Sequence, residues 1–258
     1  MARLTIFAKG NSDVADSLFF CSDGGASWGG INEALRGQGR DLRVRLRHET
    51  FIRSDALGAA PGDVPQALSH LAFEWPYTAA DQFGAGFFEA TADAYVLSIQ
   101  PDVTMKLLRH RASGSLFYPG APQKIAKDQI PWLRAECDMA ALLEPDEALK
   151  SWKAVVARIR MHSAAPILFY NLSTVAPGDM LANYRGLAPT LMYRIKQFNL
   201  ALIDLSAETG VYIVDVDRLA ARHGADALKL DAVRLNAKGS RLVAEEVIRV
   251  LHEARCIL

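Results

Sequence analysis

Short apolar runs alternate with segments of helical periodicity along this chain, and that alternation limits the possible folds more than any other feature. Five runs rich in β-branched or aromatic residues are predicted to be strands: Leu4–Ala8, Leu42–Leu46, Tyr95–Ile99, Ile167–Tyr170 and Val211–Val216. Strands of this kind, separated by helices, are typical of a parallel sheet covered on both faces. We therefore predict an α/β fold with three layers, α/β/α, around a five-stranded parallel sheet.

Three of the segments between and after these runs carry apolar residues at helical spacing, namely Ala148–Arg160, Leu191–Thr209 and Ala237–Ala254. Asp146 is expected to cap the first of these helices, and Gly210 is expected to end the second. A chain of 258 residues with this alternation fits one α/β unit. We predict a single domain over residues 1–258.

The segment from Thr104 to Asp146 has a different character, because it is rich in proline and has few periodic apolar positions. We interpret it as a long insertion after the third strand. Long irregular segments in compact domains are often lids or binding loops, and a surface decoration is the alternative. Its aromatic residues Phe117, Tyr118 and Trp132 either cover a ligand or fill a small satellite core.

Charge and cysteine content bear on the partners and the compartment of this protein, which we expect to be cytoplasmic. Lysine plus arginine and aspartate plus glutamate both number 29, so net charge gives no indication of a nucleic-acid or anionic-membrane partner. Cys21, Cys137 and Cys256 form neither a close pair nor a metal-ligand spacing. We expect no nucleic acid, no membrane, no metal and no cofactor, and the sequence leaves the oligomeric state open.

Ligands of open parallel sheets bind beyond the carboxyl ends of the strands, and the first strand is followed there by Gly10-Asn11-Ser12. A glycine permits a tight turn, and a serine two residues later can stand above the sheet edge as a nucleophile beside backbone N–H groups. The alternative is that the Ser12 hydroxyl bonds only to its own loop.

The entry to the last helix adds weight to the nucleophile interpretation. The segment Asp231-Ala-Val-Arg234-Leu-Asn-Ala-Lys-Gly239 resembles the C-terminal block of the SGNH (GDSL-like) hydrolases, in which Asp-x-x-His-Leu-Asn is followed by a small residue, any residue and a glycine. The resemblance implies a flavodoxin-like topology and an ester hydrolase or acyl transferase.

The same resemblance assigns roles to individual residues. Ser12 matches the nucleophile, and Asp231 matches the acid that orients the catalytic histidine. Arg234 stands at the position of that histidine, and Asn11 replaces the usual aspartate before the serine. Gln100 stands where an asparagine would donate to the oxyanion, and the expected glycine after the second strand is missing. The resemblance therefore predicts a hydrolase framework with a divergent active site.

Arg234 cannot be the base, because a guanidinium keeps its proton near neutral pH. It is expected either to pair with Asp231 or to hold a carboxylate or phosphate. His48 at the end of the second strand is the first candidate for a replacement base. Its neighbour Glu49 is a second candidate, and Lys9 is a third.

Each of these candidates also has a purely structural interpretation. His48 would be a hydrogen-bonded histidine at a strand end, Glu49 a solvated charge, and Lys9 a partner for Asp13. Lys9, Arg47, Arg53 and Arg234 could together favour an anionic substrate, or they could point to solvent and pair with nearby carboxylates such as Asp55. Asn171, after the fourth strand, could line the same pocket.

Two classes of function follow. The first is a serine-dependent ester hydrolase or acyl transferase with a relocated base, acting on a small substrate that could be anionic. The second is a binding protein, or an enzyme of other chemistry, that uses the same crevice for a small anion without ester turnover. The distances around Ser12 are the observation that would separate them.

Overall fold

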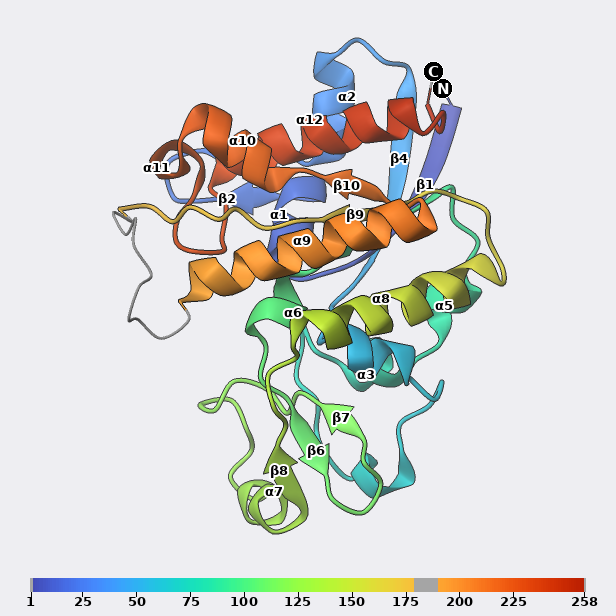
Figure 1. Ribbon diagram of the computed structural model, residues 1–258, viewed down its shortest axis with the longest axis vertical. Coiled ribbons are helices and arrows are strands. Elements are labelled where there is room, and N and C mark those ends of the chain that lie inside the picture. The colour runs from blue at the N-terminus through green and yellow to red at the C-terminus, as the bar shows by residue number, and fades with distance from the viewer. Residues whose placement is uncertain (1, 179–189, 258) are drawn as a thin grey trace.

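A computed structural model describes residues 2–178 and 190–257 of the chain. Five parallel strands form its central sheet, in the order β10-β9-β5-β1-β4 (Figure 1). Their bounds are β1 Ala2–Lys9, β4 Leu42–Glu49, β5 Ala94–Ser98, β9 Ile167–Tyr170 and β10 Tyr212–Val214. Numbered along the chain, this order is the flavodoxin-like 2-1-3-4-5. The predicted fold class is confirmed.

The register of the sheet brings the carboxyl ends of β1, β4 and β5 together. Lys9 lies opposite Glu49 on one side and Leu97 on the other. The second strand runs three residues beyond the predicted Leu42–Leu46, because β4 is an edge strand that alternates buried and exposed positions instead of staying apolar. His48 and Glu49 therefore belong to the strand itself.

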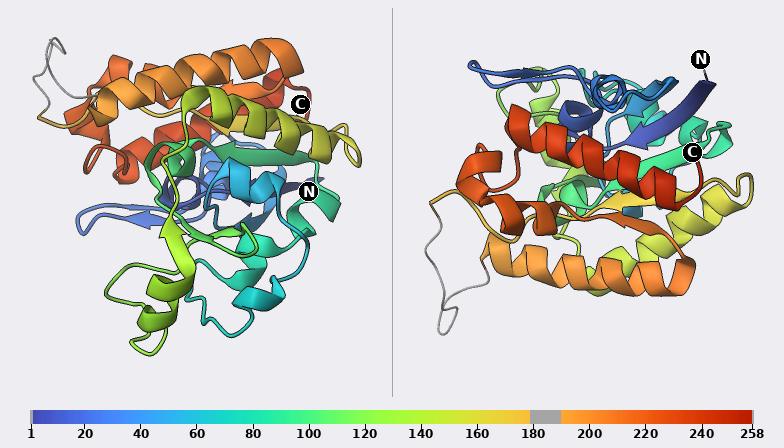
Figure 2. Two further views of the ribbon diagram at one scale, coloured as in Figure 1. Left: turned by 60° about the horizontal axis from the view of Figure 1, so that its bottom comes forward. Right: turned by 90° about the horizontal axis from the view of Figure 1, so that it is seen from above.

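Helices cover both faces of the sheet (Figure 2). One face packs against α1 Ser12–Leu18, α2 Ile31–Gly37 and α12 Ala237–Glu253, with Ile6, Ala8 and Val247 in its core. The other face packs against α8 Pro145–Arg160 and α9 Leu191–Thr209, with Phe7 and Tyr95 in its core. The elements that complete these layers and their loops are β2 Cys21–Ser22, β3 Ser27–Trp28, α3 Ser54–Gly58, α5 Gly86–Glu89, α6 Gln100–Thr104, α10 Val216–His223 and α11 Ala225–Leu228.

The helix predictions agree with the structure except at one cap. Helix α9 has the predicted bounds and ends at Gly210, which has a positive φ of 70°. Helix α8 begins earlier than predicted: Pro145 is its first residue and Glu144 is its N-cap. The expected cap Asp146 is instead inside the first turn, because Glu144 and Glu147 form a reciprocal capping box that fixes the start.

The segment after β5 is more regular than predicted. It contains a three-stranded antiparallel sheet in the order β7-β6-β8, together with a helix, at the bottom of Figure 1. These elements are β6 Leu108–His110, β7 Leu116–Phe117, α7 Ile130–Glu136 and β8 Cys137–Met139. They pack on η1 Gln66–Leu68 and α4 Ala79–Phe83, and Phe117 lies in the shared core with Trp132 against it. The satellite-core interpretation of these two aromatic residues is the one that the structure shows.

Candidate active site

Ser12 is presented to solvent at the carboxyl edge of the sheet. It is the first residue of α1 and is exposed, whereas its neighbours Asn11 and Asp13 are buried. The preceding Gly10 donates its backbone N–H to the carbonyl of Glu49 at 3.1 Å. A Cβ atom at position 10 would lie 2.4 Å from Cγ2 of Val14, so only glycine fits this turn without a shift of Val14. The local structure therefore favours an accessible serine hydroxyl.

A pocket of about 460 Å³ opens beside this hydroxyl. The structure brings Asn11, Ser12, His48 and Gln100 into its wall from three different strand ends. The other lining residues are Ala15, Asp16, Thr50, Trp75, Pro76, Tyr77, Asp81 and Met105. Of the 104–146 segment, only Met105 is in this lining, and most of the outer wall comes from residues 75–81 instead.

Asn11 and Gln100 form a fixed pair at one side of the pocket. Asn11 Nδ2 donates to Gln100 Oε1 at 3.1 Å, and Asn11 Oδ1 accepts the backbone N–H of Phe51 at 3.3 Å. Gln100 Nε2 donates to Thr104 Oγ1 at 2.9 Å. A primary amide has two N–H groups, so the second one on Gln100 Nε2 can still bind a substrate oxygen.

Asp13 follows Ser12 and supports the same wall of the pocket from the buried side. Its Oδ2 accepts a hydrogen bond from Ser98 Oγ, which in turn accepts the backbone N–H of Gln100 at 3.0 Å. Complete burial raises the pKa of the Asp13 carboxyl, and its hydrogen bonds oppose that rise only in part. Within the described ranges, Asp13 Oδ1 has no hydrogen-bond partner. Asp13 therefore links the serine turn to the end of β5.

His48 lines the pocket with one nitrogen already engaged. Its Nε2 lies 2.9 Å from the carbonyl oxygen of Gly10, and its ring meets Phe19 edge to face at 5.6 Å. Because a carbonyl can only accept, Nε2 carries the hydrogen and Nδ1 keeps its lone pair. Burial lowers the pKa of His48, so the imidazole is neutral near pH 7. His48 is a hydrogen-bonded strand-end histidine that can also accept a proton.

Lys9 is directed away from Ser12. It is 1% exposed, and its Nζ donates to Glu49 Oε2 at 2.7 Å and to the backbone carbonyl of Asp81 at 2.8 Å. The expectation that Lys9 pairs with Asp13 is therefore wrong. The Lys9 side chain leaves the face of the sheet opposite α1 and meets Glu49 on the neighbouring strand β4. Glu49 is likewise a partner in this ion pair and no solvated charge, and neither residue lines the Ser12 pocket.

The expected cationic crevice does not form among the described residues. Arg53 is buried, pairs with Asp55 and donates to the carbonyl of Ala141 at 2.8 Å. Arg47 lies over the ring of Phe7, with 4.5 Å from Cζ to the centroid. Neither arginine lines the pocket beside Ser12. The prediction that Arg53 binds substrate there is wrong, because it faces the junction with the 104–146 segment.

The final loop brings Asp231 and Arg234 to the same edge of the sheet as a surface ion pair. Arg234 Nε lies 2.6 Å from Asp231 Oδ2, and the side chains are 57% and 40% exposed. Asp231 Oδ1 accepts the backbone N–H of Val233 at 2.9 Å and that of Arg234 at 2.8 Å. Asp231 thus orients the residue three positions later, as the resemblance implied, but that residue is a cation.

Asn171 lies outside the pocket of Ser12. Its Nδ2 donates to Asp215 Oδ1 at 2.8 Å, and its Oδ1 accepts the backbone N–H of Asp217 at 3.1 Å. It lines a separate, tight cavity that also contains Asp13 and Lys229. The prediction that Asn171 contacts the same substrate is wrong, because its amide joins β9 to the start of α10.

Two groups of pocket residues were missed by sequence reasoning. Asp16 follows Ser12 by four residues, and the helical signal of the short α1 was not recognised. Trp75, Tyr77 and Asp81 come from a segment with no periodic pattern. Thr50 Oγ1 anchors that segment to the end of β4 by a 2.9 Å bond to Asp81 Oδ2.

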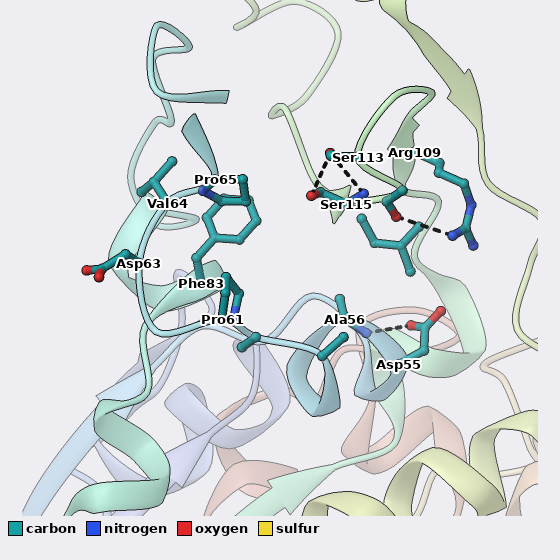
Figure 3. Close-up of a pocket in the computed structure, with 14 residues that line it drawn as sticks. Asp55, Ala56, Pro61, Asp63, Val64, Pro65, Phe83, Arg109, Ser113 and Ser115 are labelled. Carbon is teal, nitrogen blue, oxygen red and sulfur yellow. Dashed lines mark hydrogen bonds between the residues drawn. The ribbon is translucent and has the colours of Figure 1, made fainter. Parts of the chain in front are cut away.

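A second and larger cavity, of about 710 Å³, lies between the end of α3 and the β6–β7 hairpin (Figure 3). Its walls carry Phe83 and Pro65 on one side and Ser113 and Ser115 on the other (Figure 3). None of the residues that the sequence predicted for the site lines this cavity. Its lining does include Asp55, which pairs with the predicted site residue Arg53. The chemistry-bearing residues therefore concentrate at the smaller pocket.

Comparison with known proteins shows similarity at the level of structure. No family model and no curated protein sequence matches the chain. The acetyl xylan esterase AlAXEase superposes with a TM-score of 0.55 at 10% identity, covering 96% of this chain and 100% of that one. A protein from Slackia heliotrinireducens assigned to the SGNH hydrolases gives 0.51 at 14% identity, covering 96% and 99%. Axe2, an acetylxylan esterase from Geobacillus stearothermophilus, gives 0.51 at 12% identity, covering 95% and 93%.

This protein has the SGNH-hydrolase fold. The likeness spans nearly the whole chain, so it includes both the Ser12 turn and the final loop. Within this SGNH fold, Asn11 and Gln100 follow the carboxyl ends of β1 and β5, and Arg234 lies in the loop before α12.

Over residues 2–178 and 190–257, no helix is both long and apolar enough to cross a membrane. The same residues contain no group of three or more histidine, cysteine, aspartate or glutamate side chains placed to hold a metal ion.

Proposed function

We propose that this protein is a serine-dependent ester hydrolase or acyl transferase that acts on a small substrate in the pocket beside Ser12. The observation that carries the proposal is the shared pocket itself. An exposed serine hydroxyl, a free amide N–H on Gln100 and two groups able to accept a proton, His48 and Asp16, line one cavity. Nucleophile, oxyanion donor and base are the parts that acyl transfer requires.

In the proposed reaction, Ser12 Oγ attacks the carbonyl carbon of an ester while its proton passes to a base of the pocket. The electron pair of the carbonyl moves to the oxygen, and the free N–H of Gln100 Nε2 is positioned to bind that oxyanion. The amide of Gln100 is held on both sides, by Asn11 and Thr104, so little reorganisation is needed as charge develops. The alcohol then leaves with the proton, and water or another acceptor takes the acyl group from Ser12.

The charges of the pocket favour a neutral or cationic substrate. Asp16 and Asp81 line it, and the described lining contains no lysine or arginine. Carboxylates repel an anionic ligand, and the described lining contains no lysine or arginine that would offset this repulsion. The earlier expectation of an anionic substrate is therefore withdrawn, and the anion-binding alternative loses its main support. The two acetylxylan esterases among the similar structures support short acyl esters as first probes.

The test is turnover of p-nitrophenyl acetate between pH 7 and 9 by the wild type, Ser12→Ala and Ser69→Ala. Ser69 is also an exposed serine, but it lies outside this pocket and serves as the matched control. We expect Ser12→Ala to lose ester turnover and labelling by a fluorophosphonate, with an unchanged melting temperature, and Ser69→Ala to keep both. Turnover that survives in Ser12→Ala, or a wild type that neither turns over the ester nor is labelled, would overturn the proposal.

A further inference from the structure

Asp16 and Ser12 share one face of α1 and one pocket. They are four residues apart in a helix that starts at Ser12, which places their Cβ atoms about 5–6 Å from each other. Both side chains line the 460 Å³ cavity. The described residues show no direct hydrogen bond between the two side chains, and at this separation a single water molecule can bridge the hydroxyl and the carboxylate.

Asp16 also lies within the electrostatic influence of Arg234, the residue that replaces the family histidine. The positive charge of Arg234, in the final loop, lowers the pKa of Asp16 in α1. In the family resemblance, this loop brings the base to the serine. Here it brings a permanent cation to a carboxylate that already lies one helical turn from the serine.

The electrostatic setting of Asp16 suits proton transfer near neutral pH. Partial burial, together with the neighbouring Asp13 carboxyl, raises the pKa of Asp16 to about 6, and Arg234 opposes that rise. Cys21 of β2 also feels the Asp16 charge, and His48 and Asp81 are the other titratable groups of the shared pocket. A carboxylate with a raised pKa is a better base than one at its ordinary value, and it is still ionised at pH 7.

His48 is less suited to the same step. Its Nε2–H is committed to the carbonyl of Gly10, which precedes the nucleophile, and its ring is held against Phe19. These contacts fix the Gly10 turn and account for His48 without catalysis. The Asp16 carboxylate, by contrast, accepts no hydrogen bond from the described residues that would compete with Ser12.

We propose that Asp16 is the general base of this protein, the group that takes the hydroxyl proton of Ser12. This inference rests on the proposed function of Ser12. The Ser12 Oγ–H proton passes to an Asp16 carboxylate oxygen as Oγ bonds to the acyl carbon, and the departing alkoxide takes that proton. In the second half, Asp16 accepts a proton from the attacking water or alcohol and returns it to Ser12 Oγ as the acyl–serine bond breaks.

The decisive experiment measures kcat/KM for p-nitrophenyl acetate and the rate of fluorophosphonate labelling of Ser12 from pH 4.5 to 9. In the wild type, kcat/KM should rise with increasing pH through a transition near pH 6, where Asp16 ionises. This transition is the limb of the pH profile that the variants test. Asp16→Asn should lose about 100-fold or more and also lose that limb. Asp128→Asn, an exposed aspartate outside the pocket, is the matched control and should behave as the wild type.

Arg234→Ala provides an independent arm that does not alter the carboxylate. Loss of the cation should move the wild-type limb to higher pH, because the charged form of Asp16 is then less stabilised. His48→Gln retains an N–H for the Gly10 carbonyl and leaves the Asp16 carboxylate in place, so the pH dependence near pH 6 should remain in this variant.

The outcomes separate the two proposals. Activity that survives in Asp16→Asn but disappears in both His48→Gln and Ser12→Ala would overturn the role of Asp16 and leave the serine hydrolase standing with His48 as base. A pH dependence that does not shift in Arg234→Ala would contradict its assignment to Asp16, because the Arg234 charge lowers the Asp16 pKa. Activity in Ser12→Ala, or no labelling of the wild type at any pH, would overturn both proposals together.

Discussion

The side-chain amide of Asn11 donates a hydrogen bond to Oε1 of Gln100, with 3.1 Å between Nδ2 and Oε1. This contact joins the residue before the candidate nucleophile to the candidate oxyanion donor, 89 positions away in the chain. An asparagine at position 11 suits a glutamine at position 100, because the Asn11 amide can donate to Gln100 Oε1. An ionised aspartate, the usual residue before the serine in the family that the sequence resembles, has no N–H to donate to that oxygen.

We predict that Asn11→Asp lowers both stability and activity. A carboxylate would face Gln100 Oε1, and the glutamine would have to rotate its amide and give up Thr104. Loss of a buried hydrogen bond with an unpaired polar atom costs about 1–3 kcal/mol. Urea unfolding would measure the stability, and p-nitrophenyl acetate turnover the activity. A variant as stable and active as the wild type would show that the pair does not fix Gln100.

Gly10→Ala is predicted to destabilise the turn through a single steric contact. The new Cβ would lie 2.4 Å from Val14 Cγ2, and Val14 is fully buried. Overpacking of this kind costs about 1–3 kcal/mol. A double-mutant cycle with Val14→Ala tests the cause, because the smaller residue should recover part of the loss. Additive effects of the two substitutions would contradict the steric explanation.

The buried Lys9–Glu49 pair is predicted to matter more than the exposed Arg234–Asp231 pair. Glu49→Gln would leave the Lys9 ammonium buried without a countercharge, at a cost of about 2–4 kcal/mol near pH 7. Burial already lowers the pKa of Lys9, and losing Glu49 lowers it further. A folded-state pKa below the unfolded value means that stability rises with pH up to the unfolded value, so the loss should shrink between pH 8 and 10.

The measurement is the free energy of unfolding of Glu49→Gln and Asp231→Asn at pH 7, 8.5 and 10. Asp231→Asn removes the acid of the exposed pair, which should be worth about 1 kcal/mol or less and should show no comparable dependence on pH in this range. Equal losses for the two variants, or a Glu49→Gln loss that grows with pH, would contradict this account.

Local sequence determined the layers of this protein. The runs Leu4–Ala8, Ile167–Tyr170 and Leu191–Thr209 became β1, β9 and α9 with bounds at or near those predicted, because apolar periodicity states which face of an element is buried. Gly210 ended α9 as predicted, because a left-handed residue is favoured only by glycine. The same local pattern placed the Gly-x-Ser turn at the carboxyl edge of the sheet, whereas the family resemblance brought the Asp231 loop to that edge.

Tertiary structure alone decided the partners. The sequence does not state that Lys9 meets Glu49 instead of Asp13, that Arg53 turns toward Ala141, or that residues 75–81 wall the pocket. Each of these depends on which strands become neighbours and which loop returns over them, a choice made by the summed packing of distant elements. Asp16 is the clearest case, because the partial burial and the neighbouring charges that set its pKa come from the folded chain, including the charge of Arg234, 218 positions later.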